Sequence, residues 1–139
     1  MSKSTKPEVS KKNEFYINKH RQYELYHFCL QYYIWKKHVD DIDSLVRQHI
    51  ALGTNITNSD ISKPTEKTAE ARELYLKKMA LVESSANETD PVIGFYIFEG
   101  VTKGLSYDEL NARHRVPCCK STYYKLYRKF FYILHMKRQ

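Results

Sequence analysis

The sequence is poor in the residues that build turn-rich or membrane-spanning proteins. It has four glycines and four prolines in 139 residues, which argues against a β-sandwich or barrel with many tight turns. No stretch approaches the roughly 20 apolar residues of a membrane span. The first residues, MSKSTKPEVSKK, contain no hydrophobic core of a signal peptide. We therefore expect a soluble, cytoplasmic protein that has no membrane partner.

Cysteine is also scarce, with Cys29, Cys118 and Cys119 as the three residues of this type. An odd number without a secretion signal argues against a disulfide framework. Adjacent cysteines do not provide the C-x-x-C spacing that zinc sites prefer. The chain also lacks a Gly-rich phosphate loop, an H-E-x-x-H motif and a G-x-S-x-G motif. We expect no metal, no other cofactor and no enzymatic activity.

Acidic residues are missing from one end of the chain. Residues 111–139 carry eight basic residues and no acid, a net charge of +8. Residues 1–13 carry four lysines and one glutamate, or +3, whereas residues 14–110 carry eleven basic and fifteen acidic residues, or −4. Such segregation indicates a polyanion partner, most simply nucleic acid. A solvated basic tail is the alternative, but residues 111–139 are also rich in large apolar residues that require burial.

Apolar residues recur at helical spacing along most of the chain, and this pattern predicts an all-α fold. The expected helices cover residues 14–52, 65–87, 90–103, 107–114 and 120–135. The aromatic stretch 32–35 either continues one buried helix or bends between two helices, and the sequence leaves both open. We expect a disordered basic arm at 1–13, a helical interaction or oligomerisation region at 14–89 and a helix-turn-helix DNA-binding domain at 90–139.

Capping and turn residues mark the expected helix ends. Gly53 is a candidate C-cap for the first helix, and it opens a polar loop over residues 53–64. Thr65 is expected to begin the next helix. Further along, Asp90 is placed as an N-cap and Gly104 as the residue that ends the same helix.

The segment after Gly104 contains the strongest local motif. Ser106 and Glu109 have the spacing of a capping box, in which each side chain accepts a hydrogen bond from the other residue's backbone amide. A short helix over 107–114, a turn at 116–119 and a long basic helix then follow. Together these elements predict a helix-turn-helix, with Leu110 packed beneath the turn.

The second helix of this motif is the expected DNA reader, because an α-helix fits the major groove and its first turns reach base edges. Its outward face is expected to carry Lys120, Ser121, Thr122, Tyr124, Lys125, Arg128 and Lys129. The expected base readers are Ser121, Thr122, Tyr124 and Lys125. The expected phosphate contacts are Lys120, Arg128 and Lys129 on the helix, with Arg113 and Arg115 beside the turn.

The pattern GLSYDELNARHRVPCCKSTYYKLYRKFFYIL resembles the C-terminal part of RinA-type phage transcriptional regulators. It is also similar to the helix-turn-helix of sigma-factor region 4, although Arg115 stands where that motif often has glycine. The resemblance implies an activator of phage late-gene transcription that acts in the bacterial host cytoplasm, binds promoter-proximal DNA and has RNA polymerase as a further partner. It assigns Ser121, Thr122, Tyr124, Lys125 and Arg128 to the recognition helix.

Two other functions are compatible with the sequence. A DNA-packaging adaptor of the small-terminase type would bind DNA as part of an oligomer, although such proteins usually lead with their DNA-binding motif. An RNA-binding antiterminator would stack bases on Tyr123, Tyr124 and Tyr127. The periodicity buries Tyr123 and Tyr127, which leaves Tyr124 as the stacking residue.

The Tyr- and Trp-rich segment 23–35 has apolar groups on more than one side. Either it is buried within one chain or it forms the interface of a homodimer, and both interpretations stay open. A dimer would place two recognition helices on two half-sites of DNA.

Overall fold

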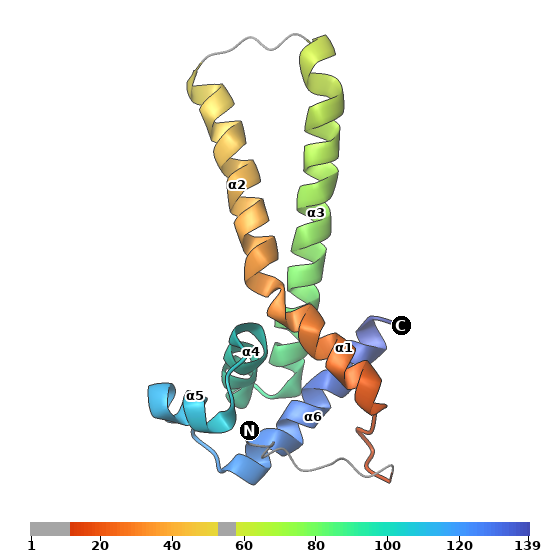
Figure 1. Cartoon of the computed structure of the whole chain (residues 1–139), viewed down its shortest axis with the longest axis vertical. Helices are drawn as coiled ribbons and strands as arrows, with labels where there is room; N and C mark the ends of the chain where they lie inside the picture. The colour runs from red at the N-terminus through yellow and green to blue at the C-terminus, as the bar shows by residue number, and fades with distance from the viewer. Residues whose placement is uncertain (1–11, 53–57) are drawn as a thin grey trace. The chain divides into compact units, whose positions relative to one another are not determined.

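The computed structural model describes residues 12–52 and 58–139, with the backbone alone for residues 58–67. Within these residues the chain forms six α-helices and no strand, which confirms the all-α prediction (Figure 1). The helices are α1 (Lys19–Leu30), α2 (Tyr32–Ala51), α3 (Asn58–Thr89), α4 (Ile93–Lys103), α5 (Tyr107–His114) and α6 (Lys120–Lys137). No helix in this part of the chain is long and apolar enough to cross a membrane.

The chain divides into two compact units, which we describe separately. Of the described residues, the terminal unit comprises 12–31 and 81–139, and the hairpin unit comprises 32–52 and 58–80. Helix α3 runs from the hairpin unit into the terminal unit. Helix α1 therefore shares a unit with α4, α5 and α6, although it lies within the interaction region predicted over residues 14–89.

Helix α4 is central to the terminal unit, because α1, α5 and α6 all pack against it, and α1 also packs against α6. Ring contacts join the helices: Tyr26 of α1 meets Phe131 of α6 with ring centroids 6.5 Å apart. On α4, a Cβ added at Gly100 would lie 2.6 Å from the Tyr123 hydroxyl oxygen and 3.1 Å from a Leu110 methyl carbon. Glycine at this position thus lets α4 approach both α5 and α6 closely.

The first predicted helix, 14–52, is two helices that break at Gln31. Of the two alternatives left open for the aromatic stretch, the structure therefore has separate helices. The first begins at Lys19 rather than at residue 14. The reason is local, since the Asn18 side chain accepts a hydrogen bond from the His20 amide at 2.8 Å and caps α1.

The polar loop predicted over 53–64 is too long. Helix α3 already begins at Asn58, so the helix start predicted at Thr65 is wrong. Polar composition does not by itself stop a helix. Gly53 and the basic arm up to residue 11 lie outside the described residues.

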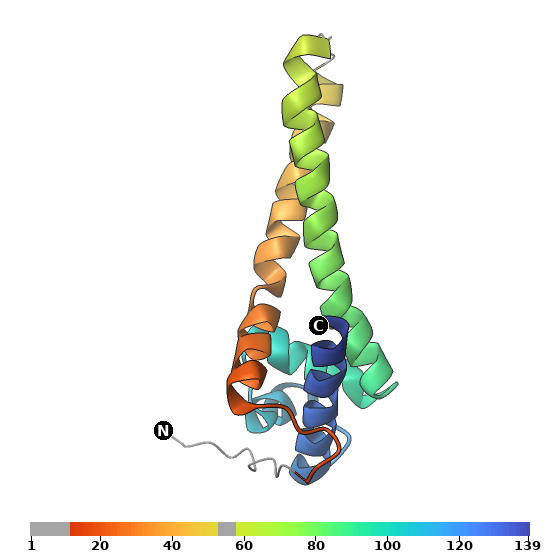
Figure 2. The same cartoon turned by 90° about the vertical axis from the view of Figure 1, so that its right-hand side faces the viewer.

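In the hairpin unit, α2 and the first part of α3 run antiparallel (Figures 1 and 2). Polar and aromatic contacts join the two helices. Arg72 donates from Nε to Asp43 Oδ1 at 2.7 Å, and the rings of His38 and Tyr75 stack with centroids 4.9 Å apart. Near the other end the Lys78 ammonium lies 5.7 Å from the Trp35 ring centroid.

Candidate nucleic-acid interface

Helix α4 precedes α5, and the sequence predicted a residue at each end of α4, Asp90 and Gly104. Asp90 Oδ2 accepts hydrogen bonds from the amides of Val92 and Ile93 at 2.9 and 2.7 Å and thus satisfies two backbone donors at the start of α4, although the residue in the N-cap position is Val92. At the other end Gly104 adopts the left-handed conformation, with φ 69°, and ends the helix. Glycine takes this conformation without the steric cost that a Cβ adds.

The capping box at the start of α5 is present as predicted. Ser106 Oγ accepts from the Glu109 amide at 3.2 Å, and Glu109 Oε1 accepts from the Ser106 amide at 2.9 Å. These hydrogen bonds from Ser106 hold the pKa of the Glu109 carboxyl below its usual value. Helix α5 covers Tyr107–His114, the range that was predicted.

The turn over residues 115–119 is held by contacts at both ends. Arg115 is in the left-handed region, with φ 55° and ψ 78°, and its amide donates to the Asn111 carbonyl. The Asn111 side chain accepts from the Val116 amide at 3.0 Å. The Tyr107 hydroxyl donates to the Cys118 carbonyl at 2.6 Å and ties the start of α5 to the end of the turn.

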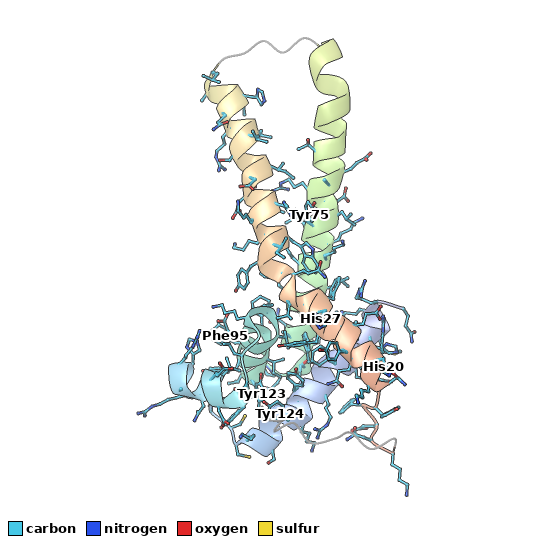
Figure 3. All side chains as sticks on the ribbon, viewed as in Figure 1. His20, His27, Tyr75, Phe95, Tyr123 and Tyr124 are labelled. Atoms are coloured by element: carbon cyan, nitrogen blue, oxygen red, sulfur yellow. The ribbon has the colours of Figure 1, made fainter. Side chains whose placement is uncertain are left out.

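Tyr124 does not lie on the exposed face of α6, and this part of the sequence prediction is wrong. Its side chain is 2% exposed, and its hydroxyl accepts a hydrogen bond from the Tyr107 amide at 3.1 Å. Figure 3 shows Tyr123 and Tyr124 on the same stretch of α6. Helix α6 is packed on two sides, so its buried face is wider than the single stripe that the sequence suggested. We remove Tyr124 from the candidate interface.

The other predicted contact residues differ in their exposure. The exposed ones are Ser121, Thr122, Lys125, Arg113 and Arg115, and the half-buried ones are Lys120, Arg128 and Lys129. Lys120 forms an ion pair with Asp108 of α5, with Nζ 3.0 Å from Oδ2. Ser121, Thr122 and Lys125 thus lie on the first turns of α6, with Arg113 and Arg115 at the end of α5.

Cys119 is the N-cap residue of α6 and its thiol is exposed. Its Sγ lies 3.3 Å from both the Ser121 and the Thr122 hydroxyl oxygens. Hydrogen bonds from these hydroxyls and from the start of the helix lower the pKa of the Cys119 thiol to about 6. The cysteine therefore belongs to the same surface as the candidate base readers.

Two residues that organise the motif were not foreseen. Asn111 and Tyr107 hold the turn through a side-chain acceptor and a hydroxyl donor, as described above. The sequence carried a signal for Asn111, since short polar side chains commonly satisfy backbone groups at turns. No local signal could reveal the Tyr107–Cys118 hydrogen bond, because it depends on how the two helices are placed.

In the residues that the structure describes, no three His, Cys, Asp or Glu side chains are grouped to hold a metal ion. Comparison with protein-family models, curated proteins and solved structures gives no significant match for this chain. The candidate function therefore rests on the arrangement of α5, the turn and α6.

Proposed function

We propose that this protein is a sequence-specific DNA-binding regulator of transcription that uses α5, the 115–119 turn and α6 as a helix-turn-helix. The observation that carries the proposal is the exposure of Ser121, Thr122 and Lys125 at the start of α6 and of Arg113 and Arg115 before it, all in a segment of sequence without acids. Hydroxyl and ammonium groups on the first turns of such a helix reach base edges in the major groove.

The remaining basic residues suit phosphate contacts. Arg113 and Arg115 extend from the end of α5 and from the turn, while Arg128 and Lys129 follow one to two turns further along α6. Side chains in such flanking positions fix the register of a protein on the duplex and supply most of its salt-dependent affinity. Lys120 is paired with Asp108, so its contribution would require exchange of that partner for a phosphate.

The burial of the tyrosines on α6 argues against the RNA-binding alternative. Tyr123, Tyr124 and Tyr127 are between 0% and 4% exposed, so none of them offers a ring face on which a base could stack. By the resemblance to RinA-type regulators, we extend the proposal to a phage-encoded activator of late genes with host RNA polymerase as a second partner. The domain at 90–139 then binds DNA.

The experiment is selection of bound duplexes from a random pool, followed by fluorescence-anisotropy titration against a scrambled duplex and a structured RNA. We expect an enriched motif, bound at least about 10³-fold more tightly than the scrambled duplex. Equal competition by the RNA, or no enrichment of any duplex, would contradict DNA-sequence recognition. Activation is then tested by in vitro transcription from a template that carries the selected motif, with and without the protein.

A further inference from the structure

Two cysteines follow one another where the 115–119 turn meets α6. Cys119 is exposed, Cys118 is half-buried, and both are free thiols. Cys119 occupies the N-cap position of α6, where helices prefer serine, threonine, asparagine or aspartate. A serine would fill this position at least as well, so helix capping does not account for the sulfur. We call Cys118 and Cys119 the cysteine pair.

The two thiols of the pair differ in reactivity. Hydrogen bonds from Ser121 and Thr122 lower the pKa of Cys119 to about 6, so its exposed sulfur is a thiolate at neutral pH. The thiolate is the form of cysteine that attacks an oxidant. Burial and the neighbouring Cys119 sulfur raise the pKa of the Cys118 thiol, which stays protonated. An exposed thiolate beside a second thiol is the arrangement of a redox-sensitive cysteine with its resolving partner.

We propose that the cysteine pair is an oxidation site at which a hydroperoxide converts Cys118 and Cys119 into a disulfide, and that this disulfide weakens DNA binding by α6. The effect on binding rests on the DNA-binding function proposed above. The oxidation itself is a property of the two thiols and does not depend on that function.

The reaction has two steps. The Cys119 thiolate attacks one oxygen of the hydroperoxide, the O–O bond breaks, and Cys119 becomes a sulfenic acid while an alkoxide or hydroxide leaves. The Cys118 sulfur then attacks the Cys119 sulfur, the S–O bond breaks, and the hydroxyl group leaves with the Cys118 proton as water. Two thiols are thus oxidised to one disulfide, and the hydroperoxide is reduced to an alcohol or to water.

A disulfide between adjacent residues is easily reversed. Neighbouring Cα atoms lie about 3.8 Å apart across a trans peptide bond, whereas disulfides usually join residues whose Cα atoms are about 4.4–6.8 Å apart. The bond within the cysteine pair is therefore strained, and strained or exposed disulfides are the labile ones. We expect a dithiol to restore the reduced form.

The peptide bond inside the disulfide ring also helps to position α6. Its carbonyl, that of Cys118, accepts a hydrogen bond from the Tyr107 hydroxyl at 2.6 Å. The Cys119 sulfur lies 3.3 Å from the hydroxyl oxygens of Ser121 and Thr122. Closing the ring draws the sulfur away from both hydroxyls and strains the peptide bond that Tyr107 holds. Oxidation therefore disturbs the first turn of α6, which carries two of the candidate base readers.

The first experiment tests the chemistry without DNA. The full chain is treated with hydrogen peroxide, remaining thiols are alkylated after denaturation, and tryptic peptides are analysed by mass spectrometry. Trypsin releases the pair in one peptide, residues 116–120. We expect this peptide to lose two hydrogens, reversibly with dithiothreitol, while the buried Cys29 is recovered alkylated. A pair that is recovered fully alkylated, or a sulfenic acid that persists on Cys119 of the wild type, would overturn the proposal.

Two single variants assign the roles of the thiols. Cys118→Ser removes the resolving thiol, and we expect a sulfenic acid on Cys119 that dimedone traps. Cys119→Ser keeps a good N-cap residue and should leave Cys118 unmodified at the same peroxide concentration. Equal oxidation of Cys118 with and without its neighbour would contradict the order of the steps.

The second experiment measures binding to the selected duplex by fluorescence anisotropy before and after peroxide. We expect oxidation to weaken binding by the wild type about tenfold, which corresponds to the loss of one or two hydrogen bonds, and dithiothreitol to restore it. Cys119→Ser is the matched control and should bind equally before and after treatment. A disulfide that forms without a change in affinity would overturn the regulatory effect. Failure to select any duplex would overturn the DNA-binding function and this effect with it, but not the oxidation site.

Discussion

At the residue scale, Cys119 is exposed at the start of α6, and its thiol has four neighbouring donors, the hydroxyls and the backbone amides of Ser121 and Thr122. We predict that its alkylation rate with iodoacetamide rises through about pH 6, whereas an ordinary cysteine follows a pKa near 8.5. Cys29 is buried, and burial raises the pKa of its thiol, so it should stay unmodified in the folded protein. Mass spectrometry of samples that are alkylated at pH 5–9 and then digested gives the extent of modification of Cys119 and of Cys29 separately. A Cys119 rate that rises only near pH 8.5 would contradict the assignment.

The same lowered pKa links Cys119 to stability. The folded state favours the thiolate, so the stabilisation is fully present above the ordinary pKa of the unfolded chain and is lost as the pH falls through about 6. Denaturant unfolding of the wild type and Cys119→Ala should therefore differ most above about pH 8.5, with the gap narrowing toward pH 6.

Arg115 is the second residue whose conformation makes a prediction. It holds a positive φ of 55°, in a region where a side chain with a Cβ is strained by about 1–2 kcal/mol. Arg115→Gly relieves this strain but adds freedom to the unfolded chain, so the free energy of unfolding should rise by about 0.5–1 kcal/mol. Urea unfolding measures the change. A destabilised variant would show that the arginine side chain contributes more than its backbone costs.

At the element scale, one of the contacts between α5 and α6 is a hydrogen bond to a tyrosine hydroxyl. Tyr124→Phe removes the acceptor of the Tyr107 amide and should cost about 1–2 kcal/mol of unfolding free energy. Tyr123→Phe is the matched control, because the Tyr123 hydroxyl is buried and has no hydrogen-bond partner among the described residues. Its loss should be neutral or stabilising.

Chemical denaturation and amide hydrogen exchange at Tyr107 measure both tyrosine variants. Exchange at this amide should accelerate in Tyr124→Phe and remain slow in Tyr123→Phe. Equal stability of the two variants would mean that the hydrogen bond to Tyr124 does not hold the start of α5.

The elements that could be predicted from sequence are those with local signals. The capping box and the spacing of apolar residues predicted the limits of α5, and Gly104 predicted the end of α4, because each signal lies within one turn of the helix end. The sequence did not predict the start of α3 at Asn58, because the polar composition of residues 53–64 and the proline at position 64 are both typical of loops.

The sequence predicted most residues of the candidate site. It placed Tyr124 on the exposed face wrongly, because the burial of this residue depends on tertiary contacts. Periodicity placed Tyr123 and Tyr127 inside, but it assumed one packing partner for α6. The structure packs α1 and α4 against the helix, so Tyr124 is buried as well. Which helices meet is set by contacts between distant parts of the chain, such as Phe28 with Arg138, whose guanidinium carbon lies 3.9 Å from the ring centroid. The local spacing of apolar residues in the sequence does not indicate such contacts.

At the scale of the whole molecule, the charge is divided along the chain. The acid-free segment 111–139 carries a net charge of +8 and contributes the candidate DNA-binding surface, whereas residues 14–110 carry a net charge of −4. A two-fold dimer, if the chain forms one, would favour a selected DNA motif that contains an inverted repeat.

The most direct test of DNA recognition by α6 is the salt dependence of binding to the selected duplex, measured by fluorescence anisotropy for paired variants. Lys125→Ala with Arg113→Ala removes two exposed cations of the candidate interface. Lys37→Ala with Lys77→Ala removes two exposed cations of the hairpin unit and is the control. We predict that the first pair lowers affinity at least about tenfold and reduces the salt slope by about 2, while the control changes neither. Equal affinity and equal slope in the two pairs would contradict the account.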